Sequence, residues 1–419
     1  MSKKIIVSQS SALNGTVRLA GAKNSALRLL AASLLTSETI KLIEYPANLL
    51  DAQVHVDMLR YLGKEIVVDT DTVGIHEKGS LICTLDWDGR SIRNNLLILG
   101  SLVSRFGAGQ VPLTGGCNLG DRRYDLHVLL LERLGAKVWL KGNMLCAEVI
   151  GNRLTGADIY LPIRSTGATE NGILCGVLAK GVTRIWNPHI RPEILDLISL
   201  LRKMGARINV HGQEHIEIEG VESLGGAEHE IIPDNIEAVT WIVAASITGG
   251  EIEIENFPYD DLEVVMTHLK WAGANLFRSD ESLFVRGGVC YPIELRTGPH
   301  PGINSDVQPL LAAWAAKARG ESRIVDLRFP GRYGYAQEMS QMGLSHEIRG
   351  DMLVLHGAGG GLTGATVRAL DLRAGAALVL CGLIAVGETV IEDAWQVERG
   401  YSNFVEKLRS LGAQAEWID

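Results

Sequence analysis

The sequence predicts a two-domain α/β protein made of six similar segments, because the chain is long and two features in it are periodic. At 419 residues it exceeds what one hydrophobic core usually organises, so two domains of roughly 200 residues are expected. Glycines that follow an apolar residue recur at intervals of 68 to 72 residues. They are Gly63, Gly135, Gly205, Gly273, Gly343 and Gly412.

Each of these glycines is predicted to end a helix and to precede a strand. The stretch before it has the period of an amphipathic helix, as in VDMLRYLG at residues 56–63, and the stretch after it alternates in polarity. Each segment also carries an earlier helix that is apolar almost all round and is therefore expected to be buried. These helices are predicted at residues 24–35, 94–106, 168–179, 236–246, 307–316 and 374–385.

Polar or charged residues stand at the start of every predicted buried helix. They are Lys23 with Asn24, Arg93 with Asn94, Arg164 with Ser165, Asp234 with Asn235, Ser305 with Asp306, and Asp371 with Arg373. A second position of the repeat, which follows the buried helix, is an arginine in three of the segments: Arg122, Arg332 and Arg399. If the helices direct their N-termini at a shared cleft, these termini and cations form an anion-binding site. Any one of the cations alone is equally consistent with a solvated charge.

A glycine-rich loop, GGCNLGDRRYDLH at residues 115–127, carries the strongest indication of chemistry. Cys117 lies where no apolar period would bury it, and Arg122 and Arg123 are close enough in sequence to lower its pKa. Such a thiol acts as an acid or a nucleophile. The alternative is a surface turn with an incidental cysteine.

Composition excludes several classes of protein. The net charge of −9 disfavours a nucleic-acid partner, and no apolar run approaches the roughly 20 residues that span a bilayer. The six cysteines form no C-x-x-C pair, so neither a zinc site nor a disulfide framework is expected, and no spacing suggests another metal. The start MSKKIIVSQS lacks the apolar stretch of a secretory signal, so a cytoplasmic location is expected.

Signature-like segments along the whole chain resemble those of UDP-N-acetylglucosamine enolpyruvyl transferases. The segments are LAGAKNSAL, GGCNLGDRRYDLH, STGAT, PDNIEA, RTGPHPGINSDVQ, GRYGYAQEMSQMG, ALDLRAGAALVLCG and VERGYSNFVEKLRSLGA. The cysteine loop distinguishes this family from the 5-enolpyruvylshikimate-3-phosphate synthases, which share the fold. The resemblance implies a two-domain inside-out α/β barrel, with domains at 22–232 and at 1–21 plus 233–419. The active site would lie in the cleft between them.

The resemblance also implies the reaction. The enolpyruvyl group of phosphoenolpyruvate would pass to the 3-hydroxyl of UDP-N-acetylglucosamine, with release of phosphate, as the first committed step of peptidoglycan precursor synthesis for the cell wall. Cys117 would be the acid and Asp306 the base, with Lys23 and Arg399 also catalytic. Substrate would be bound by Asn24, Arg93, Arg122, Arg123, Asp125, His127, Arg164, Ser165, Gly167, Arg332, Asp371 and Arg373. No cofactor is implied.

The departures from the family pattern fall on the acceptor side. Ile163 replaces a lysine expected at the diphosphate, and Asn235 replaces an arginine. Arg123, Arg164 and Arg191 add positive charge that we expect around the nucleotide. Another uridine nucleotide, such as UMP in nucleoside-antibiotic synthesis, is therefore the main alternative acceptor. A shikimate-type transferase and a non-catalytic nucleotide-sugar-binding relative are further alternatives.

Overall fold

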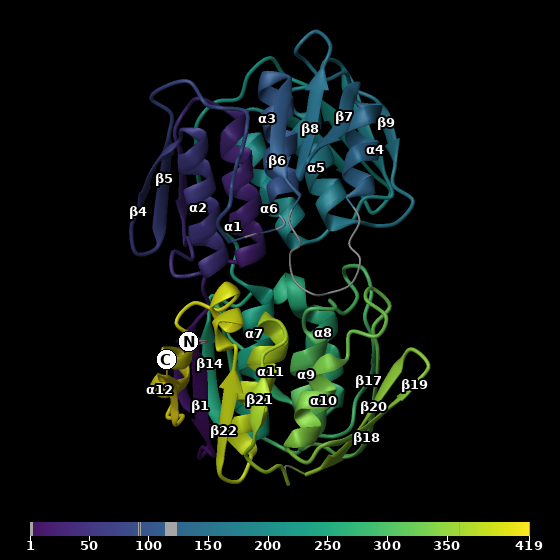
Figure 1. Ribbon diagram of the computed structural model, residues 1–419. Coiled ribbons are helices and arrows are strands. Elements are labelled where there is room, and N and C mark those ends of the chain that lie inside the picture. The colour runs from purple at the N-terminus through teal and green to yellow at the C-terminus, as the bar shows by residue number, and fades with distance from the viewer. Residues whose placement is uncertain (1–2, 91, 93, 114–123, 360, 419) are drawn as a thin grey trace. The chain divides into compact units, whose positions relative to one another are not determined.

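The computed structural model describes residues 3–90, 92, 94–113, 124–359 and 361–418, which fall into two compact units (Figure 1). The first unit comprises the described residues between Gly21 and Ile232. The second combines the residues up to Ala20 with those from Pro233 onward. Each unit has its own hydrophobic core.

The first unit alternates helices and strands. Its helices are α1 (Lys23–Ala32), the 3₁₀ turn η1 (Ser33–Leu35), α2 (Leu50–Leu62), α3 (Asn95–Phe106), α4 (Asp125–Arg133), α5 (Thr166–Gly176) and α6 (Pro192–Lys203). Its strands are β3 (Ile40–Ile43), β4 (Glu65–Val68), β5 (Thr72–His76), β6 (Ala108–Pro112), β7 (Ala136–Lys141), β8 (Met144–Val149), β9 (Asp158–Tyr160), β10 (Val182–Trp186), β11 (Arg207–His211), β12 (His215–Glu219) and β13 (Ala227–Glu230). They form sheets in the orders β13-β3-β5-β4, β6-β8-β7 and β11-β12-β10-β9.

The second unit is built in the same manner and takes in the start of the chain. Its helices are α7 (Asn235–Thr248), α8 (Tyr259–Trp271), α9 (Gln308–Lys317), α10 (Gly334–Gln341), α11 (Leu372–Ile384), the 3₁₀ helix η2 (Ala394–Arg399) and α12 (Phe404–Ser410). Its strands are β1 (Lys4–Ser8), β2 (Asn14–Arg18), β14 (Glu251–Glu255), β15 (Asn275–Arg278), β16 (Ser282–Arg286), β17 (Glu294–Arg296), β18 (Arg319–Val325), β19 (Ser345–Arg349), β20 (Met352–Ala358), β21 (Thr366–Arg368), β22 (Glu388–Glu392) and β23 (Ala415–Ile418). The sheets are β21-β22-β1-β23, β15-β16-β14-β2 and β17-β18-β20-β19.

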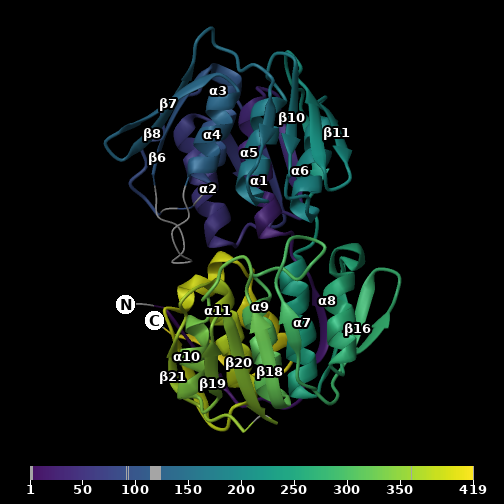
Figure 2. The same ribbon diagram turned by 90° about the vertical axis from the view of Figure 1, so that its right-hand side faces the viewer.

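The helices predicted to be buried lie inside the units. In the second unit α7, α9 and α11 pack against one another, and sheets lie outside them (Figure 2). Almost every residue of α7 and α11 is buried, because alanine, valine, isoleucine and leucine occupy all sides of these helices. In the first unit α3 packs against α1 and α5. The prediction of buried helices is confirmed at each of its positions.

The periodic glycines end helices and lead into strands, as predicted. Their φ angles lie between 92° and 109°, in the left-handed region that a Cβ atom disfavours. The strands that follow them are β4, β7, β11, β15, β19 and β23. Among the described residues, no helix is long and apolar enough to cross a membrane.

One pairing pattern recurs in the sheets. In each four-stranded sheet one outer strand pairs parallel with its neighbour, as β13 does with β3, and the other pairings are antiparallel. The sheet β6-β8-β7 shows its parallel partner only as the isolated bridge between Thr84 and Gln110. The first strands of the chain, β1 and β2, complete two sheets of the second unit.

Candidate active site

Arg332 joins the N-terminal ends of two inner helices in the second unit. Its Nη1 donates to the Asp306 carboxylate at 2.9 Å and its Nη2 donates to the Asp371 carboxylate at 3.3 Å. Burial alone would lower the pKa of Arg332, but Asp306 and Asp371 outweigh burial and hold that pKa above its usual value. The predicted site residues Asp306, Arg332 and Asp371 are therefore together in the structure.

Arg373 is the most unusual side chain of this cluster, which we call the arginine cluster (Asp234, Asp306, Arg332, Asp371 and Arg373). It is fully buried, yet none of its guanidinium nitrogens has a hydrogen-bond partner among the described residues. Burial opposes its charge, whereas Tyr401, Asp234 and Asp306 raise its pKa by a larger amount. A permanent cation whose three nitrogens have no other hydrogen-bond partner is suited to an anion.

Aromatic packing fixes the Arg373 guanidinium. Its central carbon lies 5.0 Å from the centroid of the Tyr401 ring, a cation–π distance. The Tyr401 hydroxyl bonds Thr240 at 2.9 Å and also lies close enough to Arg373 to raise its pKa. The Tyr401 ring and the nearby carboxylates thus hold the buried guanidinium in place.

The carboxylates of the arginine cluster also cap helices. Asp371 accepts from the backbone N–H groups of Arg373 and Ala374 at 2.7 and 2.9 Å, and Asp234 accepts from Ile236 and Glu237 at the start of α7. Burial, which outweighs the attraction of Arg373, raises the pKa of Asp234. Helix N-termini that meet buried cations form a positive environment for an anionic ligand.

Asp326 supports the cluster and was not predicted. It is fully buried and accepts hydrogen bonds from Thr297 at 2.8 Å, from Ser305 at 2.5 Å, and from the backbone N–H groups of Arg328 and Phe329. Ser305 precedes Asp306, and the Arg328–Phe329 turn leads to Arg332. The only sign of Asp326 in the sequence was a single acidic residue directly after the apolar end of β18.

In the first unit, Lys23 begins α1 and is paired with α2. Its Nζ lies 3.3 Å from Asp51, and both side chains are largely buried. Asn24, next to it, is half-buried. In the second unit, Arg399 ends η2 and donates to Gln396 at 3.0 Å. Lys23 and Arg399 thus belong to different units.

The N-terminal end of α5 brings several other predicted residues together. Ser165 caps the helix by accepting from the Ala168 N–H at 3.4 Å. His127 is buried against Gly167, where a Cβ atom would lie 3.2 Å from the ring, and its Nδ1 bonds Asn171 at 3.0 Å. A side chain at Gly167 would therefore press on the His127 ring.

The added arginines of this region differ in their surroundings. Arg164 is half-buried and donates to the Asn187 side chain at 3.3 Å. Arg191 makes a two-pronged ion pair with Glu193, at 2.6 and 2.7 Å, and both are mostly buried. The charge of Arg191 is thus partly offset by Glu193, and its expected place around a nucleotide stays a prediction.

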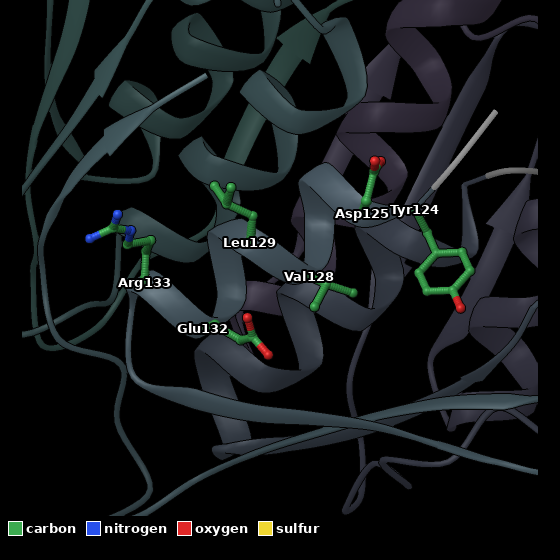
Figure 3. Close-up of a pocket in the computed structure, with 6 residues that line it drawn as sticks. All are labelled: Tyr124, Asp125, Val128, Leu129, Glu132 and Arg133. Atoms are coloured by element: carbon green, nitrogen blue, oxygen red, sulfur yellow. The ribbon is translucent and has the colours of Figure 1, made fainter. Parts of the chain in front are cut away.

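A pocket of about 690 Å³ lies along one face of α4 (Figure 3). Tyr124, Asp125, Val128, Leu129, Glu132 and Arg133 line it. Asp125 is the one predicted site residue in this lining, and its exposed carboxylate accepts from the Leu126 N–H at 3.0 Å. The pocket lacks the buried cations of the arginine cluster, so we assign it no substrate.

Several predicted site residues lie outside the described residues. These are Cys117, Arg93, Arg122 and Arg123. The other cysteines are free thiols. Burial raises the pKa of Cys290 to about 11 and that of Cys381 to about 12, so these two are poor nucleophiles.

Comparison with known proteins places the chain in a family. A family model described as EPSP synthase (3-phosphoshikimate 1-carboxyvinyltransferase) matches residues 7–408. The chain is 39% identical to UDP-N-acetylglucosamine 1-carboxyvinyltransferase 1 of Caldanaerobacter subterraneus subsp. tengcongensis, covering 99% of both chains. It is 40% identical to UDP-N-acetylglucosamine 1-carboxyvinyltransferase of Glaesserella parasuis, covering 96% of both.

Solved structures show the same mixed α/β fold. The enolpyruvyl transferase NikO from Streptomyces tendae matches with a TM-score of 0.90 and 26% identity, over 100% of this chain and 99% of that one. EPSP synthase from Acinetobacter baumannii matches with a TM-score of 0.81 and 20% identity over the whole of both chains, which shows the fold alone. The chain therefore belongs to the enolpyruvyl (1-carboxyvinyl) transferase family of enzymes, among the relatives of the UDP-N-acetylglucosamine 1-carboxyvinyltransferases.

Proposed function

We propose that this enzyme transfers the enolpyruvyl group of phosphoenolpyruvate to the 3-hydroxyl of UDP-N-acetylglucosamine and releases phosphate. The names of its relatives at 39% and 40% identity support this acceptor. The reaction would supply peptidoglycan synthesis, and we expect it in the cytoplasm. The observation that carries the proposal is the buried Arg373 guanidinium, none of whose three nitrogens has a well-formed hydrogen bond to a described residue.

The donor substrate matches this site chemically. Phosphoenolpyruvate is a small polyanion with a phosphate and a carboxylate, and a fixed cation bound to it costs no reorganisation during reaction. We assign the carboxylate mainly to Arg332 and Arg373, and the phosphate mainly to Lys23, Arg93 and Arg122, with Arg399 near both. Lys23 and Arg332 already face carboxylates, so an incoming anion would compete with Asp51 and Asp306 for them.

The proposed mechanism has an addition and an elimination. In the addition, the acceptor hydroxyl attacks C2 of phosphoenolpyruvate and gives its proton to Asp306, while Cys117 protonates the methylene carbon. The product is a tetrahedral ketal. In the elimination, the C2–O bond to phosphate breaks and the departing phosphate takes the proton that Asp306 had gained. Asp306 is then again free to accept a proton from the new methyl group, which regenerates the enol double bond, and this proton returns to the Cys117 thiolate.

We also propose that each unit is half of an inside-out α/β barrel and that six related segments make up the chain. The recurring sheet pattern and the glycines at helix ends support six segments. The domains would be 22–232 and 1–21 with 233–419. By the resemblance, the active site would take Lys23 and Asn24 from one unit and Asp306 and Arg373 from the other.

The acceptor contacts are proposed from the first unit. Asn24, Asp125, His127, Ser165 and Gly167 would seat the nucleotide sugar. Arg164 and Arg123 would set the position of its phosphates, since an arginine that binds phosphate with two hydrogen bonds is worth roughly 1.5 to 3 kcal/mol.

A phosphate-release assay tests the proposal. The wild type is incubated with phosphoenolpyruvate and, separately, UDP-N-acetylglucosamine, UMP or shikimate 3-phosphate. We expect release with UDP-N-acetylglucosamine, and a reduction of about ten- to a hundredfold in Arg164→Ala. Release with UMP but not with the sugar nucleotide would favour the alternative acceptor. Release with shikimate 3-phosphate alone would refute the uridine assignment.

A further inference from the structure

Helix α2 holds the N-terminal ends of two inner helices through side chains one turn apart. Asp51 lies 3.3 Å from the Lys23 ammonium of α1, and His55 Nδ1 lies 3.1 Å from the Asn94 amide nitrogen at the start of α3. His55 is fully buried and Asn94 nearly so. The same face of α2 therefore contacts both ends.

The hydrogen bonds determine the form of His55. The Asn94 amide nitrogen donates to the Leu27 carbonyl of α1 at 2.6 Å, which identifies it as the nitrogen and not the oxygen of the amide. Its second hydrogen then points to His55 Nδ1, so Nδ1 is the acceptor and the ring proton is on Nε2. Burial, and secondarily the charge of Arg28, lowers the pKa of His55 to about 3, which keeps the ring neutral.

This arrangement is a costly way to fill a core. His55 Nε2 has no hydrogen-bond partner among the described residues, and a buried donor without a partner is destabilising. An apolar residue would avoid that cost but would leave the second hydrogen of the Asn94 amide, the one not bound to Leu27, without an acceptor. The hydrogen bonds of His55 and Asn94 connect α1, α2 and α3 near their N-terminal ends.

We infer that His55 and Asn94 are positioning residues, which hold the start of α3 at a fixed place relative to Lys23. Asn94 bonds α1 through Leu27 and α2 through His55, while Asp51 on α2 holds Lys23. The inference rests on the proposed function, in which Lys23 binds the phosphate of phosphoenolpyruvate. Loss of the pair should therefore weaken phosphoenolpyruvate and leave the acceptor unaffected.

The opposite ends of the same helices offer a matched control. Glu77 binds Lys64, which follows α2, at 2.8 Å, and binds Arg105 of α3 at 2.7 Å. Both cations also donate to the Thr36 carbonyl just after η1. Glu77→Gln should thus loosen the packing of these helices far from Lys23.

The experiment compares His55→Leu, His55→Asn and Glu77→Gln with the wild type. Steady-state phosphate release gives KM for phosphoenolpyruvate and for UDP-N-acetylglucosamine, and a thermal melt gives Tm. We expect His55→Leu to raise KM for phosphoenolpyruvate about five- to tenfold, with the acceptor KM within about twofold. His55→Asn, which keeps an acceptor near Nδ1, should recover most of this, and Glu77→Gln should lower Tm without changing either KM.

Several outcomes would overturn the inference. One is that His55→Leu and Glu77→Gln both lower Tm with the phosphoenolpyruvate KM unchanged, which would make the pair merely structural. Another is an equal rise of both KM values, or no recovery in His55→Asn. Failure of the proposed function is a separate result, since the wild type itself would then release no phosphate with UDP-N-acetylglucosamine. In that case phosphoenolpyruvate is titrated directly into the wild type and into His55→Leu. Equal affinity of the two proteins for it would overturn the inference.

Discussion

Acid should destabilise the first unit through His55, and the structure sets the size of the effect. The ordinary pKa near 6.5 falls to about 3 in the folded chain, because the ring is buried and Arg28 lies nearby. The fold therefore favours the neutral ring. The contribution of His55 to stability is complete above about pH 6.5 and is lost as the pH falls from there toward 3.

The magnitude follows from the linkage of protonation to folding. Each unit of pH below the unfolded pKa costs about 1.4 kcal/mol, so the wild type should lose about 2 kcal/mol between pH 7 and pH 5 through His55 alone. His55→Asn keeps the acceptor for Asn94 but does not titrate. The difference in the free energy of unfolding, wild type minus His55→Asn, should therefore fall by about 2 kcal/mol when the pH is lowered from 7 to 5.

Amide hydrogen exchange of α2 is the suitable assay, because it reports the opening of the unit that contains His55 without requiring both units to unfold together. Exchange is measured at pH 7, 6 and 5 and corrected for the intrinsic rate at each pH. If wild type and His55→Asn lose protection in parallel, His55 is not held neutral by the fold and the hydrogen-bond assignment is refuted.

Three further predictions concern the proposed site. Asp306→Asn should lower turnover by on the order of 10²-fold while phosphoenolpyruvate still binds, because the base is lost and the shape is kept; turnover within a few-fold of wild type would make Asp306 structural. Arg373→Met should weaken phosphoenolpyruvate about ten- to a hundredfold by calorimetric titration, and urea unfolding should show a loss of stability as well, because Asp234 and Asp306 lose the attraction of this cation; an unchanged affinity would refute the assignment. Cys117 should be alkylated by small phosphonate epoxides such as fosfomycin, and mass spectrometry should find the adduct there; a label on Cys290 instead would contradict this, because burial raises the pKa of that thiol to about 11.

The periodic features of the fold were determined by the sequence alone. The glycine at each helix end and the apolar residues on all sides of the inner helices are local properties, and a local conformation or a need for burial follows from them directly. The positions of Gly63 or Gly412, and of α7 or α11, could therefore be predicted without knowledge of any neighbour.

Only the tertiary structure decided which charges are available to a ligand. Arg191 and Arg373 are both arginines at the start of a helix, yet the charge of Arg191 is partly offset by Glu193, while no guanidinium nitrogen of Arg373 has a well-formed hydrogen bond to a described residue. Pairing depends on the direction of side chains in three dimensions. Likewise the pairing of His55 with Asn94, 39 residues apart, gave no signal in the sequence, because a hydrogen bond between helices leaves no period in either of them.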